Sequence, residues 1–128
     1  MNKKMLATAA IIGAIAIILG AFGAHALKKV LNPDQLATFE TGVKYQMYHA
    51  LFLLFAGTSL LISDNAKRGI LYLVVTGVLF FSGSIYLLAT NDLTSFDFKI
   101  IGFITPVGGL LLIMAWIWLF IDILNKKS

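Results

Sequence analysis

The sequence contains no cysteine, and this absence removes several kinds of chemistry at once. Disulfide bridges, thiolate nucleophiles and metal sites with cysteine ligands are all excluded. Charged residues are also scarce, at 12% of the chain, whereas about 25% is usual in soluble proteins. Because 59% of the 128 residues are hydrophobic, a soluble fold could not bury the apolar surface. The composition therefore predicts an integral membrane protein.

The basic residues do not form a nucleic-acid surface. The formal net charge is +4, but the lysines stand at the ends of apolar runs and not along one amphipathic face. Basic stripes interleaved with aromatic side chains, which nucleic-acid binding needs, are missing. Lysine and arginine beside apolar runs are typical of membrane proteins, so we expect membrane lipids and no nucleic acid as partners.

Four apolar segments are long enough to cross a bilayer, which takes about 20 residues of helix. They cover residues 5–27, 45–62, 69–89 and 100–123. The links at 63–68 and 90–99 are short and polar, so consecutive spans are expected to be antiparallel neighbours. We predict an all-α integral membrane protein: a four-transmembrane-helix antiparallel bundle that forms a single domain over residues 1–128.

The first segment also has features of a secretory signal peptide. Lys3 and Lys4 precede an apolar run, and Ala24-His25-Ala26 offers small residues at its end. However, the run is about 20 residues long, whereas the apolar part of a signal peptide has about 7–15. A first transmembrane span is the preferred interpretation, and a signal peptide is the alternative.

The distribution of basic residues predicts the orientation in the membrane. With four spans, both termini lie on one side. The basic residues on that side are Lys3, Lys4, Lys67, Arg68, Lys126 and Lys127, and those on the other side are Lys28, Lys29, Lys44 and Lys99. The excess on the terminal side predicts cytoplasmic N- and C-termini.

A helix start is readable between the first two spans. Asn32 is suited to cap a helix, Pro33 to its first position and Gln35 to its third. Apolar residues then recur at helical spacing: Leu36, Phe39 and Val43. The pattern predicts a short interfacial amphipathic helix over 33–43, which turns at Gly42 into the second span.

Small residues indicate where helices pack closely. On the first span, one side carries Ala9, Gly13, Ala16, Gly20 and Gly23, and the other carries Ile11, Ile12, Ile15, Ile18, Leu19 and Phe22. We expect the small side to face protein and the large side to face lipid. In the fourth span, Pro106 with Gly108 and Gly109 should bend or loosen the helix about one turn inside its outer end.

Two histidines suggest a polar cluster near the outer ends of the first two spans. His25 lies about one turn inside the end of the first span and His49 about one turn inside the start of the second, so we expect both rings at one depth. Tyr45 and Gln46 share the face of His49, and Glu40 is close enough to join the rim. Polar side chains inside a membrane are costly, so this cluster is a candidate functional site.

This cluster has a structural interpretation and a functional one. It either locks the first two spans together by hydrogen bonds or binds a proton, an ion, a quinone or a lipid-like ligand. Two histidines without a third ligand do not predict a metal site, and we expect no cofactor.

The sequence favours a non-enzymatic protein. Catalysis would need a nucleophile or paired carboxylates inside the bundle, and the acidic residues lie outside the spans or at their ends. An accessory or interaction protein, which binds itself or a larger membrane protein, is the first hypothesis. A binding or transport module is the alternative, although transport through four spans would require an oligomer.

Several motifs resemble one known family. The stretches GAFGAHALKK at 20–29, KYQMYHALFLLFAG at 44–57, SGSIYLLA at 82–89 and TPVGG at 105–109 resemble the YgdD/YwdK-like family of small inner-membrane proteins. The family pattern falls here on Gly20, Gly23, His25, Tyr45, His49, Pro106, Gly108 and Gly109. The resemblance implies a four-span protein of the bacterial plasma (inner) membrane, in a family without an established activity.

Overall fold

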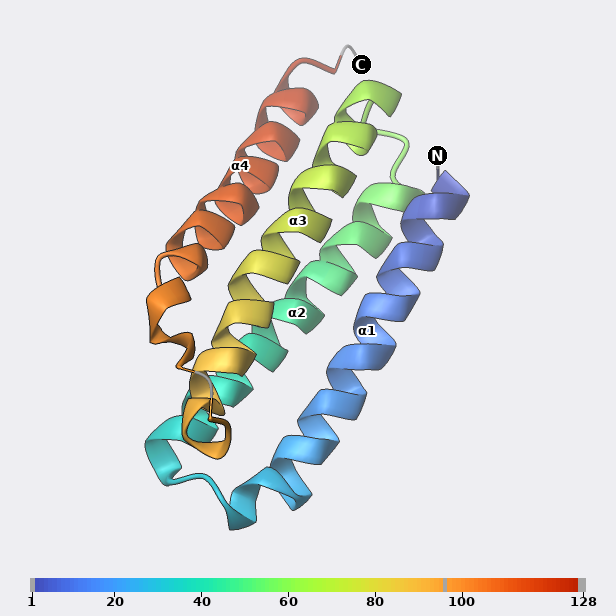
Figure 1. Ribbon diagram of the computed structural model, residues 1–128. Helices are drawn as coiled ribbons and strands as arrows, with labels where there is room; N and C mark the ends of the chain where they lie inside the picture. The colour runs from blue at the N-terminus through green and yellow to red at the C-terminus, as the bar shows by residue number, and fades with distance from the viewer. Residues whose placement is uncertain (1, 96, 127–128) are drawn as a thin grey trace.

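The computed structural model describes residues 2–95 and 97–126, and all its regular elements in these ranges are helical. The α-helices are α1 (Asn2–His25), α2 (Pro33–Thr58), α3 (Asp64–Ala89) and α4 (Ile104–Leu124). Short 3₁₀ turns follow or precede them at Leu27–Lys29, Asn91–Leu93 and Phe98–Ile101. Both ends of the chain lie at the same end of the bundle (Figure 1).

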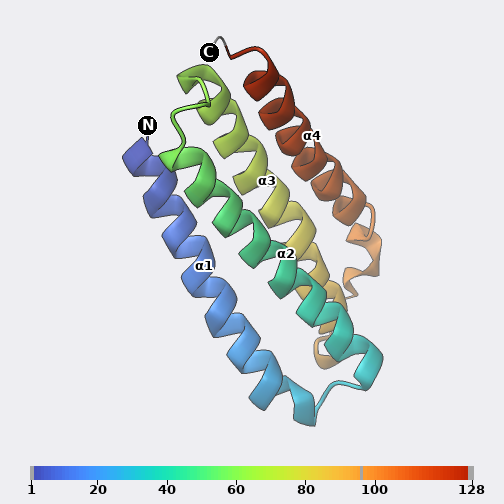
Figure 2. The same cartoon turned by 180° about the vertical axis from the view of Figure 1, so that it is seen from behind.

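The helices form a row in chain order. α1 packs against α2, α2 against α3, and α3 against α4, so that α1 and α4 are the two edges (Figures 1 and 2). The main core lies along α2 and α3 and includes Leu53, Ile70 and Val74, all without exposed surface. Large apolar side chains cover the outside of the edge helices, and such a surface suits a lipid environment.

Within the described ranges, three helical segments are long and apolar enough to cross a membrane: Asn2–Lys29, Asp64–Ala89 and Lys99–Leu124. They include the first, third and fourth predicted spans. The second predicted span, 45–62, overlaps α2, but α2 ends at Thr58. The first half of α2 is more polar because it carries Asp34, Glu40 and Lys44.

The start of α2 agrees with the sequence pattern. The side-chain oxygen of Asn32 accepts a hydrogen bond from the backbone N–H of Gln35 at 2.8 Å, and the Gln35 side chain accepts one from the Asn32 N–H at 3.0 Å. Pro33 occupies the first helical position, where its missing N–H costs no bond. The predicted helix start is therefore confirmed.

The predicted turn at Gly42 is wrong, and so is a separate interfacial helix over 33–43. α2 runs without a break from Pro33 to Thr58. Gly42 instead permits close packing on α3: a Cβ atom there would lie 2.6 Å from the Tyr86 ring, and the Gly42 carbonyl accepts a hydrogen bond from the Ser82 hydroxyl at 2.7 Å. This glycine is needed for tertiary packing and does not end the helix.

The small side of α1 faces protein, as predicted, and the neighbouring helix is α2. Ala9, Ala16 and Gly23 are buried, and a Cβ atom on Gly23 would lie 3.1 Å from the Phe39 ring. Most members of the large side are exposed, namely Ile11, Ile15, Ile18 and Phe22. Ile12 is half-buried and packs on the core.

The helical structure is interrupted just before Pro106. The 3₁₀ turn Phe98–Ile101 is followed by an irregular turn, and α4 begins only at Ile104. Pro106 therefore lies in the first turn of α4, where backbone N–H groups have no acceptor within the helix. The predicted interruption occurs outside α4, and Gly108 meets the backbone of α3 at Phe81.

Polar contacts hold the helices together at the end where the termini lie. The buried Lys67 ammonium donates a hydrogen bond to the Asn2 side-chain oxygen at 2.9 Å, which joins α3 to α1. The backbone N–H and the hydroxyl of Ser63 each donate to the Asp122 carboxylate at 2.8 Å, which joins the start of α3 to α4. The edge helices are thus tied to α3 at this end.

Candidate functional site

Gln46 links three helices in the middle of the row. Its side-chain N–H donates to the Ile12 carbonyl of α1 at 2.9 Å, and its side-chain oxygen accepts from the Tyr86 hydroxyl of α3 at 2.6 Å. Gln46 is only 5% exposed. Because a buried amide without partners is costly, these two bonds make Gln46 a joint between α1, α2 and α3.

Hydroxyl groups extend this polar seam along α3. The buried Ser82 donates to the Gly42 carbonyl of α2, and Ser84 shares a hydrogen bond of 2.6 Å with Thr105 of α4. The buried Ser82 and Ser84 therefore join α3 to both of its neighbours, as small polar residues often do between membrane helices.

His49 connects α2 with α4. Its Nε2 accepts a hydrogen bond from the Trp116 indole N–H at 3.1 Å, and its Nδ1 lies 2.7 Å from the Tyr45 carbonyl oxygen. The indole nitrogen can only donate, so Nε2 must be the acceptor and Nδ1 must carry the proton. The hydrogen-bond network thus fixes a neutral tautomer in which both ring nitrogens have partners.

Aromatic rings surround this histidine. Phe52 and Trp116 pack with their ring centroids 4.3 Å apart, and the Tyr45 ring meets Phe81 edge to face at 5.1 Å. Between α2, α3 and α4 lies a cavity of about 300 Å³. Its lining residues are Tyr45, His49, Phe81, Gly109, Leu112, Ile113 and Trp116. The wall is mostly apolar, and His49 is one of its few polar groups.

A second cavity, of about 240 Å³, lies between α1, α2 and α3. Its lining residues are Ile12, Ile15, Leu19, Gln46, Val78, Leu79, Gly83 and Tyr86. Both cavities border α2 and α3, and the first also borders α4 whereas the second borders α1. Each has an interhelical hydrogen-bonded pair at its wall: His49 with Trp116 in the first and Gln46 with Tyr86 in the second.

The predicted pairing of His25 with His49 is wrong. His25 is exposed at the end of α1, whereas His49 is 4% exposed. Because α1 meets α2 at Gly23 and Phe39, the two histidines lie about 18 Å apart along the helix direction, at about 1.5 Å per residue. The prediction assumed that the second span starts at Tyr45, but α2 already begins at Pro33.

Comparison with known proteins identifies the family. A family model described as "Protein of unknown function (DUF423)" matches residues 19–109, which is more than half of the chain. The chain belongs to the DUF423 family. The matched residues include Gln46, His49 and Tyr86, whereas Trp116 lies beyond them.

Relatives of this DUF423 chain are named as membrane proteins. The UPF0382 membrane protein of Staphylococcus haemolyticus is 41% identical over an alignment of 119 residues, which covers 88% of this chain and 91% of that protein. One from Haemophilus influenzae is 35% identical over 128 residues, covering 100% and 99%. The UPF0382 inner membrane protein YgdD of Escherichia coli is 33% identical over 131 residues, covering 98% and 93%. No solved structure matches the chain.

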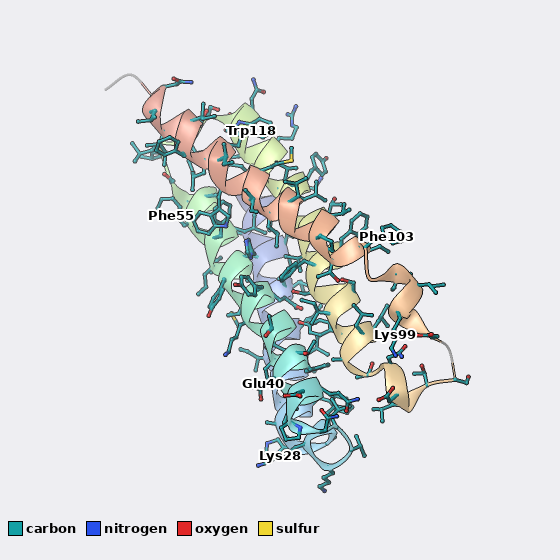
Figure 3. The ribbon with its side chains drawn as sticks, turned by 90° about the vertical axis from the view of Figure 1, so that its left-hand side faces the viewer. Lys28, Glu40, Phe55, Lys99, Phe103 and Trp118 are labelled. Carbon is teal, nitrogen blue, oxygen red and sulfur yellow. The ribbon has the colours of Figure 1, made fainter. Side chains whose placement is uncertain are left out.

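The structure separates the predicted site residues of this DUF423 chain into two groups. Gln46 and His49 lie in the buried cluster, and Tyr45 adds its carbonyl and part of its ring, although it is 41% exposed. Glu40 is exposed on α2 (Figure 3), and His25 is exposed at the end of α1, so neither joins the cluster. The observed cluster is centred deeper in the bundle than expected.

Two members of the cluster were not predicted from the sequence. Tyr86 belongs to the stretch SGSIYLLA, which stood out in the sequence only as a family motif. Trp116 lies near the end of the fourth apolar segment, where aromatic side chains often anchor a helix at the membrane interface, but its N–H reaches His49. In the described ranges, no three His, Cys, Asp or Glu side chains gather closely enough to hold a metal ion. What the cluster can do chemically is hold helices together by neutral hydrogen bonds.

Proposed function

We propose that this DUF423 protein crosses the bacterial plasma membrane four times, with α2 as the additional span and both termini in the cytoplasm. The position of α2 between α1 and α3 supports this topology, since α2 packs beside two helices that are apolar enough to span. Two polar side chains in its middle, Gln46 and His49, are buried and hydrogen-bonded, which lowers the cost of placing this part of α2 in lipid. The distribution of basic residues supports cytoplasmic termini.

Single cysteines should report this topology without background, because the chain contains no cysteine. Four exposed polar residues can be replaced by cysteine without removing a basic residue: Thr38, Asn65, Ser95 and Asn125. With Thr38→Cys and Ser95→Cys, an impermeant maleimide should label intact spheroplasts. With Asn65→Cys and Asn125→Cys, it should label only permeabilised cells. Labelling of Thr38→Cys and Asn65→Cys from the same side would contradict a membrane-spanning α2.

The function that this geometry supports best is that of a non-enzymatic accessory or interaction protein. One observation carries the proposal: the side-chain polar atoms of Gln46 and both ring nitrogens of His49 are bonded to groups of the same chain. A catalytic group must be free to meet its substrate, whereas these groups are used in joining helices. The relatives named above carry no enzymatic name.

This structural role predicts different effects for the two histidines. His49→Ala should lower the stability of the fold by about 1–2 kcal/mol, because it leaves the Trp116 N–H without an acceptor and opens space beside Phe52. His25→Ala should change it little, since His25 is exposed. Thermal unfolding in detergent measures both. Trp116→Phe should be non-additive with His49→Ala, because both remove one bond. Equal losses for His25→Ala and His49→Ala would count against this role.

A second candidate function is the binding of a quinone or lipid-like ligand. The cavity of about 300 Å³ beside His49 and Trp116 favours it, because ligand sites are mostly apolar with a few polar groups. Native mass spectrometry of the purified protein should then find a retained small molecule. Ile113→Trp, which places a larger side chain in the cavity wall, should remove that molecule and leave the unfolding temperature near its original value.

A further inference from the structure

One face of α2 carries charges beside apolar and aromatic side chains. Its residues follow one another at spacings of three and four, which places them on a single side of the helix. We call this face the α2 stripe: Glu40, Lys44, Tyr48, Leu51 and Phe55. All of them are exposed, and the three deeper ones are 52%, 56% and 51% exposed in that order. Figure 3 shows Glu40 and Phe55 toward opposite ends of α2.

The charges of the α2 stripe lie level with apolar surface on the neighbouring helix. Gly20 of α1 lies against Val43, the residue beside Lys44. At this level α1 exposes Ile18 and Phe22, which suit contact with acyl chains. A charge at such a depth is costly unless it is paired or reaches the headgroups.

Neither charge has a partner within the chain. In residues 2–95 and 97–126, the side chains of Glu40 and Lys44 make no hydrogen bond and no ion pair. The single chain therefore leaves one negative and one positive group exposed on the same face of α2. A partner that supplies both opposite charges at the same spacing would satisfy them.

A second copy of the chain meets this requirement. We propose that the α2 stripe is the contact surface of a homodimer, in which Glu40 of each copy pairs with Lys44 of the other. The proposal deepens the interaction role proposed above and rests on it. Copies inserted with the same topology are related by a two-fold axis along the membrane normal, so their α2 helices run in parallel. In a parallel helix pair, charged residues one turn apart reach across to each other, as in coiled coils.

The composition of the α2 stripe favours a second copy over a lipid headgroup. The stripe presents one charge of each sign, so it is complementary to itself and offers no net attraction for an anionic headgroup. Below the charges, Tyr48, Leu51 and Phe55 provide large side chains that can pack against the same residues of the other copy. The exposed faces of α1 and α4 carry apolar side chains such as Ile18 and Leu110 instead.

Disulfide cross-linking in native membranes tests the proposal. Ala37 is exposed one turn before Glu40, and Ala24 is exposed on α1 near the same end of the bundle. With Ala37→Cys, mild oxidation should give a cross-linked dimer, since the chain has no other cysteine. The matched control Ala24→Cys should cross-link far less. Equal cross-linking at both positions, or none at Ala37→Cys, would overturn the proposal.

Charge reversal separates contact between copies from an effect within one chain. In the Ala37→Cys background, Glu40→Lys or Lys44→Glu alone should lower the dimer fraction about fivefold or more, because like charges then face each other. Co-expression of differently tagged Glu40→Lys and Lys44→Glu chains should restore cross-linking between the two. No rescue in the mixture, with both variants keeping the original unfolding temperature, would exclude the charge pairing.

The topology experiment keeps the two proposals apart. If Thr38→Cys and Asn65→Cys label from opposite sides while Ala37→Cys gives no dimer, the four-span accessory protein stands and the homodimer is wrong. If those two cysteines label from the same side, the four-span topology fails, whatever the cross-linking yield. Co-expression of two differently tagged Ala37→Cys chains detects the dimer directly, because a disulfide between chains with different tags requires two copies.

Discussion

Replacing Gly108 with alanine is expected to separate α3 from α4 and to destabilise the fold by about 3 kcal/mol. A Cβ atom at this position would overlap the backbone of α3 at Phe80 and Phe81. A backbone cannot rotate away as a side chain can, so α4 would have to move outward. Unfolding in mixed micelles, followed by circular dichroism, measures the loss.

The neighbouring glycines provide matched controls for Gly108→Ala. A Cβ atom on Gly109 would lie 3.5 Å from the Phe81 ring, an ordinary contact, and one on Gly83 would meet nothing within 4 Å. Gly109→Ala and Gly83→Ala should therefore leave stability unchanged or raise it by about 0.5 kcal/mol, because alanine favours a helix. Equal losses for Gly108→Ala and Gly109→Ala would mean that the close approach of the two helices is not the cause.

Gln46→Leu is expected to destabilise the protein by about 2 kcal/mol. Leucine is similar in size, so the change removes the two hydrogen bonds of Gln46 with little loss of volume. It leaves the Tyr86 hydroxyl without its acceptor and removes the side-chain donor that joins α2 to the Ile12 carbonyl. The same unfolding assay measures the effect.

Tyr86→Phe tests whether the effect of Gln46→Leu comes from the shared bond. Each change alone breaks the bond between the two side chains and leaves one group unpaired. Together they remove both groups, so the combined loss should be smaller than the sum of the single losses by about 1 kcal/mol. Additive losses would assign the stability of this seam to packing instead.

Local signals in the sequence predicted the features that depend on neighbouring residues. The start of α2 at Pro33 follows from Asn32 and Gln35, which stand within one turn, and the side chain of each accepts a hydrogen bond from the backbone N–H of the other. The buried side of α1 follows from the size of its residues, because only small side chains let α2 approach along that side. Both predictions needed no knowledge of distant contacts.

Features that depend on distant partners were not predictable in this way. A glycine in a helix can mark a turn or a close contact, and Gly42 is a close contact only because Tyr86 and Ser82 of α3 lie against it. Extension of α2 through Gly42 then changes which residues share a depth, and this moves His49 away from His25. Gln46 and His49 are both buried and hydrogen-bonded, but the partner of His49 is Trp116 and not His25.

The contact between Trp116 and His49 was also not predictable from the sequence. The indole N–H could have bonded to water or lipid near an interface, as aromatic residues often do in membrane proteins. Only the packing of α4 beside α3 brings the indole within 3.1 Å of His49. The spacing of residues along the sequence does not predict a contact between residues so far apart in the chain.

The arrangement of the helices as a row has a consequence for biogenesis. Each new helix packs mainly on the one inserted before it, so a stable hairpin of α1 and α2 can form before α3 leaves the ribosome, and α3 and α4 can then add in turn. No early segment has to wait for a late one to complete its main contacts. Synthesis from the N-terminus to the C-terminus is therefore also the order of assembly, and a chain stalled after α3 would already hold most of its core.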